Sequence, residues 1–215
     1  MAKRFTSQRV NLHGELVTVD LPLLDRLHEL DETFMRGFPA ESRFDYGLGR
    51  LGLLLTDELK PLFYDRIAPR NGLAIGTTGG NGVHFNLLVS ENRVDVQSPV
   101  VVTVPGARDR LLGNIFVGEN LEDFVRYGLI RGFFAMEQFA YKREVAIAAF
   151  GSAEWQATEK WHHSVGFARD ADDIAIAEYI SKQLGLAPLT RTPEDFAALQ
   201  ERHRSKLVFD EITVP

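Results

Sequence analysis

The sequence predicts an α+β fold in which a central antiparallel meander sheet is packed by N-terminal and C-terminal helices. In the middle of the chain, apolar runs of strand length are separated by tight-turn residues, whereas both flanks carry apolar residues at helical spacing. The order is helices, strands, then helices, which differs from a repeating βαβ pattern. The 215 residues are 45% apolar and include 15 Phe. We therefore expect one domain over residues 1–215 with its own core.

The N-terminal third combines a hairpin with helices. Its elements are predicted from apolar periodicity, caps and breakers. They are a hairpin over 9–20 that turns at His13-Gly14-Glu15, a helix capped by Asp20 that ends at Gly37, a loop over 38–52 and a helix over 57–67.

The middle of the chain is predicted to form the sheet, because short β-rich runs follow one another with glycine-rich or polar breaks. The expected strands are 73–77, 83–89, 100–104 and 114–117, with breaks at 79–82 and 90–93.

The C-terminal third is predicted to be largely helical. Helices are expected over 119–129 and 133–141, from Asp170 or Asp172 to Leu184, and from a Thr192 cap followed by Pro193. Residues 145–150 fit either a strand or a helix, and residues 207–214 fit a terminal strand or an arm.

Composition excludes several functions. The formal net charge of −6 repels a phosphate backbone, so nucleic acid is not an expected partner, whereas a basic protein is. The chain has no cysteine, which excludes disulfides, thiolate zinc sites and cysteine nucleophiles. We find no signal peptide and no apolar run of membrane-spanning length. The expected location is the cytoplasm, with no membrane association.

A glycine-rich segment, residues 76–82, has the composition of a phosphate-binding loop. Such a loop needs a following helix and a lysine. Here the residues that follow have a strand pattern and the segment lacks lysine, so a hairpin turn accounts for the glycines. Within this turn, Gly79, Gly80 and Asn81 are candidate binding residues.

His84 and Asn86 lie on one face of the strand predicted over 83–89, with Phe85 on the other face. A polar face bordering a groove would let His84 bind a ligand or act as a base. The alternative, which we favour, is a structural histidine with a single hydrogen bond.

Trp161, His162 and His163 form the third candidate binding cluster. Adjacent histidines on a helix point about 100° apart, so they do not coordinate one metal ion together. Glu159 and His163 have the spacing of two zinc ligands, but a third ligand is missing. We predict no metal and no cofactor. Trp161 fits a core position or an interface anchor.

Acidic pairs occur in the first turns of three predicted helices, where they favour the helix dipole. That role explains them without a catalytic carboxylate pair, and we predict no catalytic residues.

The centre of the chain resembles the SUKH superfamily. The resemblance covers about residues 60–130 and rests on turn and core residues. They are Pro61-Leu62-Phe63-Tyr64, Ala68-Pro69-Arg70-Asn71-Gly72, the segment from Ile75 to Phe85, Ser98-Pro99-Val100-Val101 and Asn120-Leu121-Glu122-Asp123-Phe124. The sequence departs from the family pattern at Asn86, where an Asp is common, and it lacks a Trp after the Pro-Val strand.

The resemblance implies a SUKH-like α+β core with helical N- and C-terminal extensions. It also implies a non-catalytic, immunity-type role in which a toxin is neutralised by direct contact.

Three hypotheses for the function of the chain remain open. The first is a protein-binding module with a basic toxin as one class of partner. The second is an enzyme or small-molecule binder with a pocket between the sheet and the C-terminal helices. The third is a structural homo-oligomer.

Overall fold

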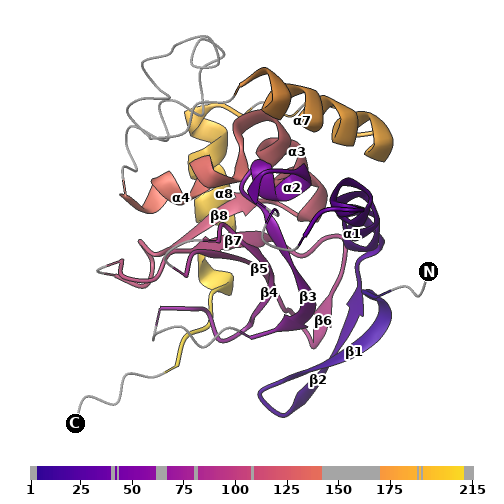
Figure 1. Ribbon diagram of the computed structural model, residues 1–215. Helices are drawn as coiled ribbons and strands as arrows, with labels where there is room; N and C mark the ends of the chain where they lie inside the picture. The colour runs from indigo at the N-terminus through magenta and orange to yellow at the C-terminus, as the bar shows by residue number, and fades with distance from the viewer. Residues whose placement is uncertain are drawn as a thin grey trace.

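A computed structural model describes residues 4–39, 42, 44–61, 67–79, 82–107, 109–141, 170–187, 189 and 191–210. Within these residues the chain forms a five-stranded sheet, a separate three-stranded sheet and helices that pack on them (Figure 1). The α+β fold with a central antiparallel meander is confirmed.

The five-stranded sheet has the order β3-β4-β5-β7-β8, and each neighbouring pair is antiparallel. Its strands are β3 (Leu54–Lys60), β4 (Gly72–Thr77), β5 (His84–Leu88), β7 (Val100–Thr103) and β8 (Asn114–Gly118). The last four confirm the four predicted strands. Most of their residues are buried, because protein covers both faces of this sheet.

The second sheet contains the predicted hairpin, β1 (Thr6–Leu12) and β2 (Glu15–Asp20). The hairpin projects beside α1 in Figure 1. Strand β6 (Arg93–Val94) pairs in parallel with β2. The sequence places a break at residues 90–93, and a strand this short carries no periodicity that would reveal it.

One face of the five-stranded sheet packs against helices in the main core. The helices are α1 (Pro22–Met35), α2 (Gly47–Arg50), α3 (Leu121–Arg131), α4 (Phe133–Tyr141) and α7 (Ala171–Leu184). Phe85 projects from β5 to within 4.8 Å of the Phe124 ring of α3, and the ring of Phe133 lies 5.1 Å from Phe124. Burial of such large apolar side chains is the main source of stability here.

Helix α8 (Pro193–His203) covers the free edge of the sheet beside β8. Gln200 accepts a hydrogen bond from the Phe116 amide at 2.9 Å and donates to the Phe116 carbonyl at 2.8 Å. Phe196 joins the main core, whereas Leu199 packs with Leu88, Val101 and Phe116 on the other face. The helix therefore blocks further strand pairing at this edge.

Three predictions for the N-terminal third are wrong. Residues 57–60 belong to the edge strand β3 rather than to a helix. Leu55 and Leu59 are both buried, and their spacing of four residues fits one face of a strand as well as one turn of a helix. Asp20 ends β2, and the helix cap is Leu21, which makes no side-chain cap bond. A short helix, α2, lies in the predicted loop.

The predicted caps of the C-terminal helices are confirmed. Asp170 and Thr192 each form a capping box with the residue three positions later. Residues 207–210 form an arm rather than a strand. The amide of Arg70 donates to the Val208 carbonyl, and the Val208 amide donates to the Asn71 side chain. The prediction for residues 145–150 falls outside the described residues.

A candidate binding site beside helix α1

The residues singled out in the sequence are not brought together by the described structure. His84 and Asn86 are almost fully buried, so the predicted polar strand face does not border an open groove. Gly79 adopts a positive φ of 85°, as a glycine turn requires. Gly80, Asn81, Trp161, His162 and His163 lie outside the described residues.

His84 and Asn86 both bond to neighbouring strand or turn residues. The Nδ1 atom of His84 lies 2.7 Å from the Gly82 carbonyl oxygen. Burial lowers the pKa of His84 despite this contact, which opposes the shift. Such an environment holds the imidazole neutral at pH 7.

Asn86, Thr103 and Asn114 form a buried polar chain across β5, β7 and β8. Asn86 donates to the Thr103 hydroxyl at 2.9 Å, and that hydroxyl donates to the Asn114 side chain at 2.7 Å. Asn114 in turn donates to the carbonyls of Ile67 and Arg110, both at 2.7 Å. Thr103 thus supplies both an acceptor and a donor, and the chain crosses the sheet as a structural element.

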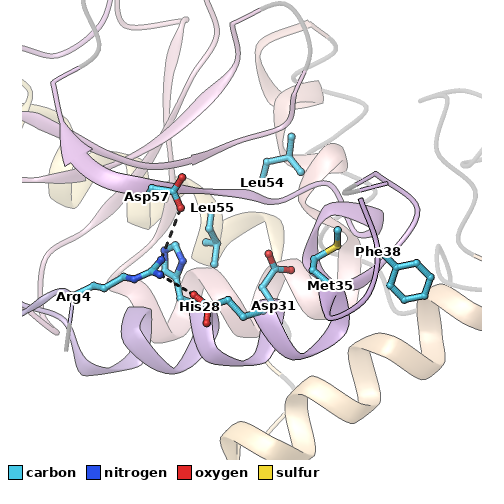
Figure 2. A pocket seen from close by; sticks show the side chains of 9 residues that line it. Arg4, His28, Asp31, Met35, Phe38, Leu54, Leu55 and Asp57 are labelled. Atoms are coloured by element: carbon cyan, nitrogen blue, oxygen red, sulfur yellow. Dashed lines mark ion pairs between the residues drawn. The ribbon is translucent and has the colours of Figure 1, made fainter. Parts of the chain in front are cut away.

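An open site lies elsewhere, between helix α1 and strand β3. A cavity of about 340 Å³ opens there, which we call the α1 cavity. Figure 2 shows its lining side chains, with Arg4 and Phe38 at opposite ends of the row. The lining residues are Arg4, His28, Asp31, Glu32, Met35, Phe38, Leu54, Leu55 and Asp57.

Helix α1 and strand β3 each bring several residues to the cavity, because side chains repeat along a helix every three or four residues and along a strand every two. His28, Asp31, Glu32 and Met35 recur three or four positions apart and therefore share one side of α1. Leu55 and Asp57 are two apart on β3 and share a face of that strand. Arg4 reaches the cavity from the residues just before β1, and its guanidinium lies 2.9 Å from the Glu32 carboxylate and 3.8 Å from that of Asp57.

His28 is the buried polar group of the cavity. It is 7% exposed, and its Nε2 atom has no hydrogen-bond partner among the described residues. Burial lowers the pKa of His28, and the charge of Arg4 lowers it further, against the opposing charges of nearby carboxylates. The imidazole is therefore neutral at pH 7 and holds an unused hydrogen-bonding atom.

Exposed aromatic side chains adjoin the cavity, and we call them the aromatic rim. They are Phe38 (45% exposed), Phe44 (50%) and Tyr46 (38%). Phe38 and Tyr46 stack with their ring centroids 4.0 Å apart. Aromatic groups left open to water in this way are typical of binding surfaces.

The glycine turn lies at the edge of this site. A Cβ atom added to Gly79 would lie 2.4 Å from the Phe44 ring and 3.0 Å from a methyl group of Leu54, which lines the cavity. Gly79 is therefore the one predicted binding residue that the described structure places against the site. Sequence reasoning missed Arg4, His28 and Glu32, although the helical spacing of His28 and Glu32 is visible in the sequence.

Neither a metal site nor a membrane segment is seen in the described ranges. There, no three His, Asp or Glu side chains gather as metal ligands would. The helices found in these ranges all lack the combination of length and hydropathy that crossing a bilayer requires.

Comparisons with known proteins give no relative. No family model matches the chain, and neither the curated proteins nor the solved structures compared with it give a significant match.

Proposed function

We propose that this protein is a non-catalytic protein-binding module whose binding surface is the α1 cavity with its aromatic rim. The observation that carries the proposal is the stacked pair Phe38 and Tyr46, which remains open to water at one end of the cavity. Tyrosine and other large aromatic side chains supply much of the binding energy at protein interfaces when a partner desolvates them.

The charge of the site favours a basic partner. Glu32 and Asp57 present carboxylates to solvent at the end of the cavity opposite Phe38, and the chain as a whole is acidic. Complementary charge accelerates association and discriminates against acidic partners. The resemblance to the SUKH superfamily adds an immunity-type role, in which the basic partner is a toxin neutralised by direct contact.

A capture experiment tests the proposal. Tagged wild-type protein and a Phe38→Ser/Tyr46→Ser variant are used to capture partners from the native lysate, and the recovered proteins are quantified by mass spectrometry. The matched control is Leu16→Ser/Val96→Ser, which also removes two exposed apolar side chains but leaves the rim intact. Circular dichroism verifies that each variant is folded.

We expect one stoichiometric basic partner that the control retains and the rim variant loses. Two hot-spot side chains together lower affinity by roughly thirtyfold or more. Equal recovery by both variants contradicts the proposed surface. If the captured protein is the chain itself, the homo-oligomer hypothesis replaces the proposal. For an immunity-type role, co-expression of the wild type, but not of the rim variant, protects cells from the partner.

The cavity volume supports a second candidate function. About 340 Å³ lies at the lower end of the range for small-molecule sites. A small polar ligand found by a thermal-shift screen, with its stabilisation abolished by Glu32→Gln, would favour this candidate over the protein partner.

A further inference from the structure

The α1 cavity carries an excess of negative charge. Three carboxylates line it, from Asp31, Glu32 and Asp57, against the single guanidinium of Arg4, and His28 is neutral. Among the described lining residues, three negative charges against one positive charge give a sum of −2. The carboxylate of Asp31 also accepts a hydrogen bond from the Leu48 amide at 3.1 Å, which fixes its position.

Arg4 is held weakly in this site. Its side chain is 46% exposed, and the Asp57 carboxylate, 3.8 Å away, is 75% exposed. Exposed ion pairs of this kind add little to the stability of a fold, because water and salt screen them. Little free energy is therefore lost when Arg4 leaves its carboxylates.

A second observation points to a ligand at the same place. The Nε2 atom of His28 is buried and lacks a hydrogen-bond partner among the described residues, on a side chain that lines the cavity. Buried polar atoms are nearly always satisfied, since leaving one unsatisfied is costly. In the tautomer that carries its proton on Nδ1, the Nε2 atom accepts a hydrogen bond, so a donor that enters the cavity would supply the missing partner.

We propose that the α1 cavity receives an arginine side chain of the protein partner, which displaces Arg4 from Glu32 and Asp57. This inference rests on the proposed function and names the group that the site recognises. A guanidinium suits the site better than an ammonium. Its planar fork bonds to carboxylates on two sides, whereas an ammonium is a compact point charge.

Arg4 competes with the ligand for the carboxylates of Glu32 and Asp57. A residue that only stabilised the site would weaken binding when replaced, whereas a competitor strengthens it. Arg4→Gln removes the resident guanidinium and keeps a polar side chain of similar length. The sign of its effect on binding therefore separates the two roles.

The test is a titration of the isotopically labelled protein by NMR with N-acetyl-arginine amide. N-acetyl-citrulline amide, which has the same shape without the charge, is the control probe. We expect saturable shifts at the amides of Glu32, Leu55 and Asp57 with the arginine probe alone. Glu32→Gln/Asp57→Asn should weaken binding about tenfold or more, and Arg4→Gln should tighten it about two- to fivefold. Glu29→Gln, an exposed change on the same helix that does not line the cavity, should leave binding unchanged.

Equal shifts with the two probes, or weaker binding by Arg4→Gln, would overturn the inference. Partner capture separates this failure from failure of the proposed function. If the rim variant loses the partner but Glu32→Gln/Asp57→Asn retains it fully, the arginine pocket is wrong and the binding surface stands. If the rim variant retains the partner, the proposed function fails whatever the probe shows.

Discussion

Two polar regions of this protein are built differently. In the polar chain of Asn86, Thr103 and Asn114, the side chains are buried and bonded to one another or to backbone carbonyls. In the α1 cavity, the ion pairs of Arg4 are half open to water, and the buried Nε2 of His28 lacks a partner among the described residues. In the first region the polar groups bond the strands of a sheet to one another, whereas in the second they can still make contacts with a ligand. A candidate binding site is therefore recognised by polar groups that can make new contacts, more than by polarity or burial alone.

The largest expected effect concerns the polar chain. Thr103→Val removes the acceptor of the Asn86 amide and the donor to Asn114, leaving two buried polar groups without this partner. Each such loss costs about 1–3 kcal/mol, so we expect the free energy of unfolding to fall by about 2–6 kcal/mol. Urea unfolding followed by circular dichroism measures it.

The control for this prediction is Thr18→Val, the same change on an exposed position of β2. It should alter the free energy of unfolding by less than about 0.5 kcal/mol. A similar small effect for Thr103→Val would mean that the polar chain contributes little to stability, and the contrast between the two regions would disappear.

Replacing His28 should change the free energy of unfolding in the opposite direction from Thr103→Val. His28→Leu exchanges a buried group with an unpaired nitrogen for an apolar side chain, so it removes a desolvation cost. We expect the free energy of unfolding to rise by about 1 kcal/mol. Binding of the arginine probe should weaken in the same variant, because leucine has no atom that accepts a hydrogen bond from the guanidinium. A loss of stability comparable to that of Thr103→Val would make His28 a structural residue.

The sheet could be predicted from sequence because its signal is local. Val83–Leu88 and Val100–Val104 are apolar runs between turn residues, and Asp170 and Thr192 stand at the start of helical patterns as caps. The edge strand β3 could not be predicted, because the four-residue spacing of Leu55 and Leu59 fits one face of a strand as well as one turn of a helix. Pairing with β4 decides its conformation, and periodicity does not report on pairing.

The candidate site was mostly hidden from sequence reasoning for a different reason. The polar residues noticed first, His84 and Asn86, stand out because they interrupt an apolar strand, but both are buried, and each contacts a neighbouring turn or strand residue. The site instead joins Arg4, residues 28–38 and residues 54–57, which only the tertiary fold brings together. Gly79 adjoins it because its turn packs against Phe44.

A smaller effect on stability is expected from the cavity carboxylates. Glu32→Gln/Asp57→Asn breaks both ion pairs of Arg4, yet both pairs are exposed. The free energy of unfolding should change by less than about 1 kcal/mol, while the arginine probe loses its affinity. Thermal unfolding beside the NMR titration separates the two effects. A large loss of stability would show that these carboxylates hold the fold together, in which case lost binding would carry no functional meaning.

The last and smallest expected effect is a difference in pH dependence. Burial, with a further contribution from the charge of Arg4, lowers the pKa of His28, and burial lowers the pKa of His84. Below about pH 6.5, the ordinary value for histidine, the unfolded chain therefore binds protons that the folded protein excludes. The stability from neutral imidazoles is fully present above that pH and is lost as the pH falls.

Urea unfolding at about pH 7, 6 and 5 measures this loss. The free energy of unfolding should decline with falling pH for the wild type and decline less steeply for His28→Leu, which retains only His84 of the two histidines. Parallel declines would mean that His28 takes up its proton as readily in the folded protein as in the unfolded chain, and that the cavity does not desolvate it.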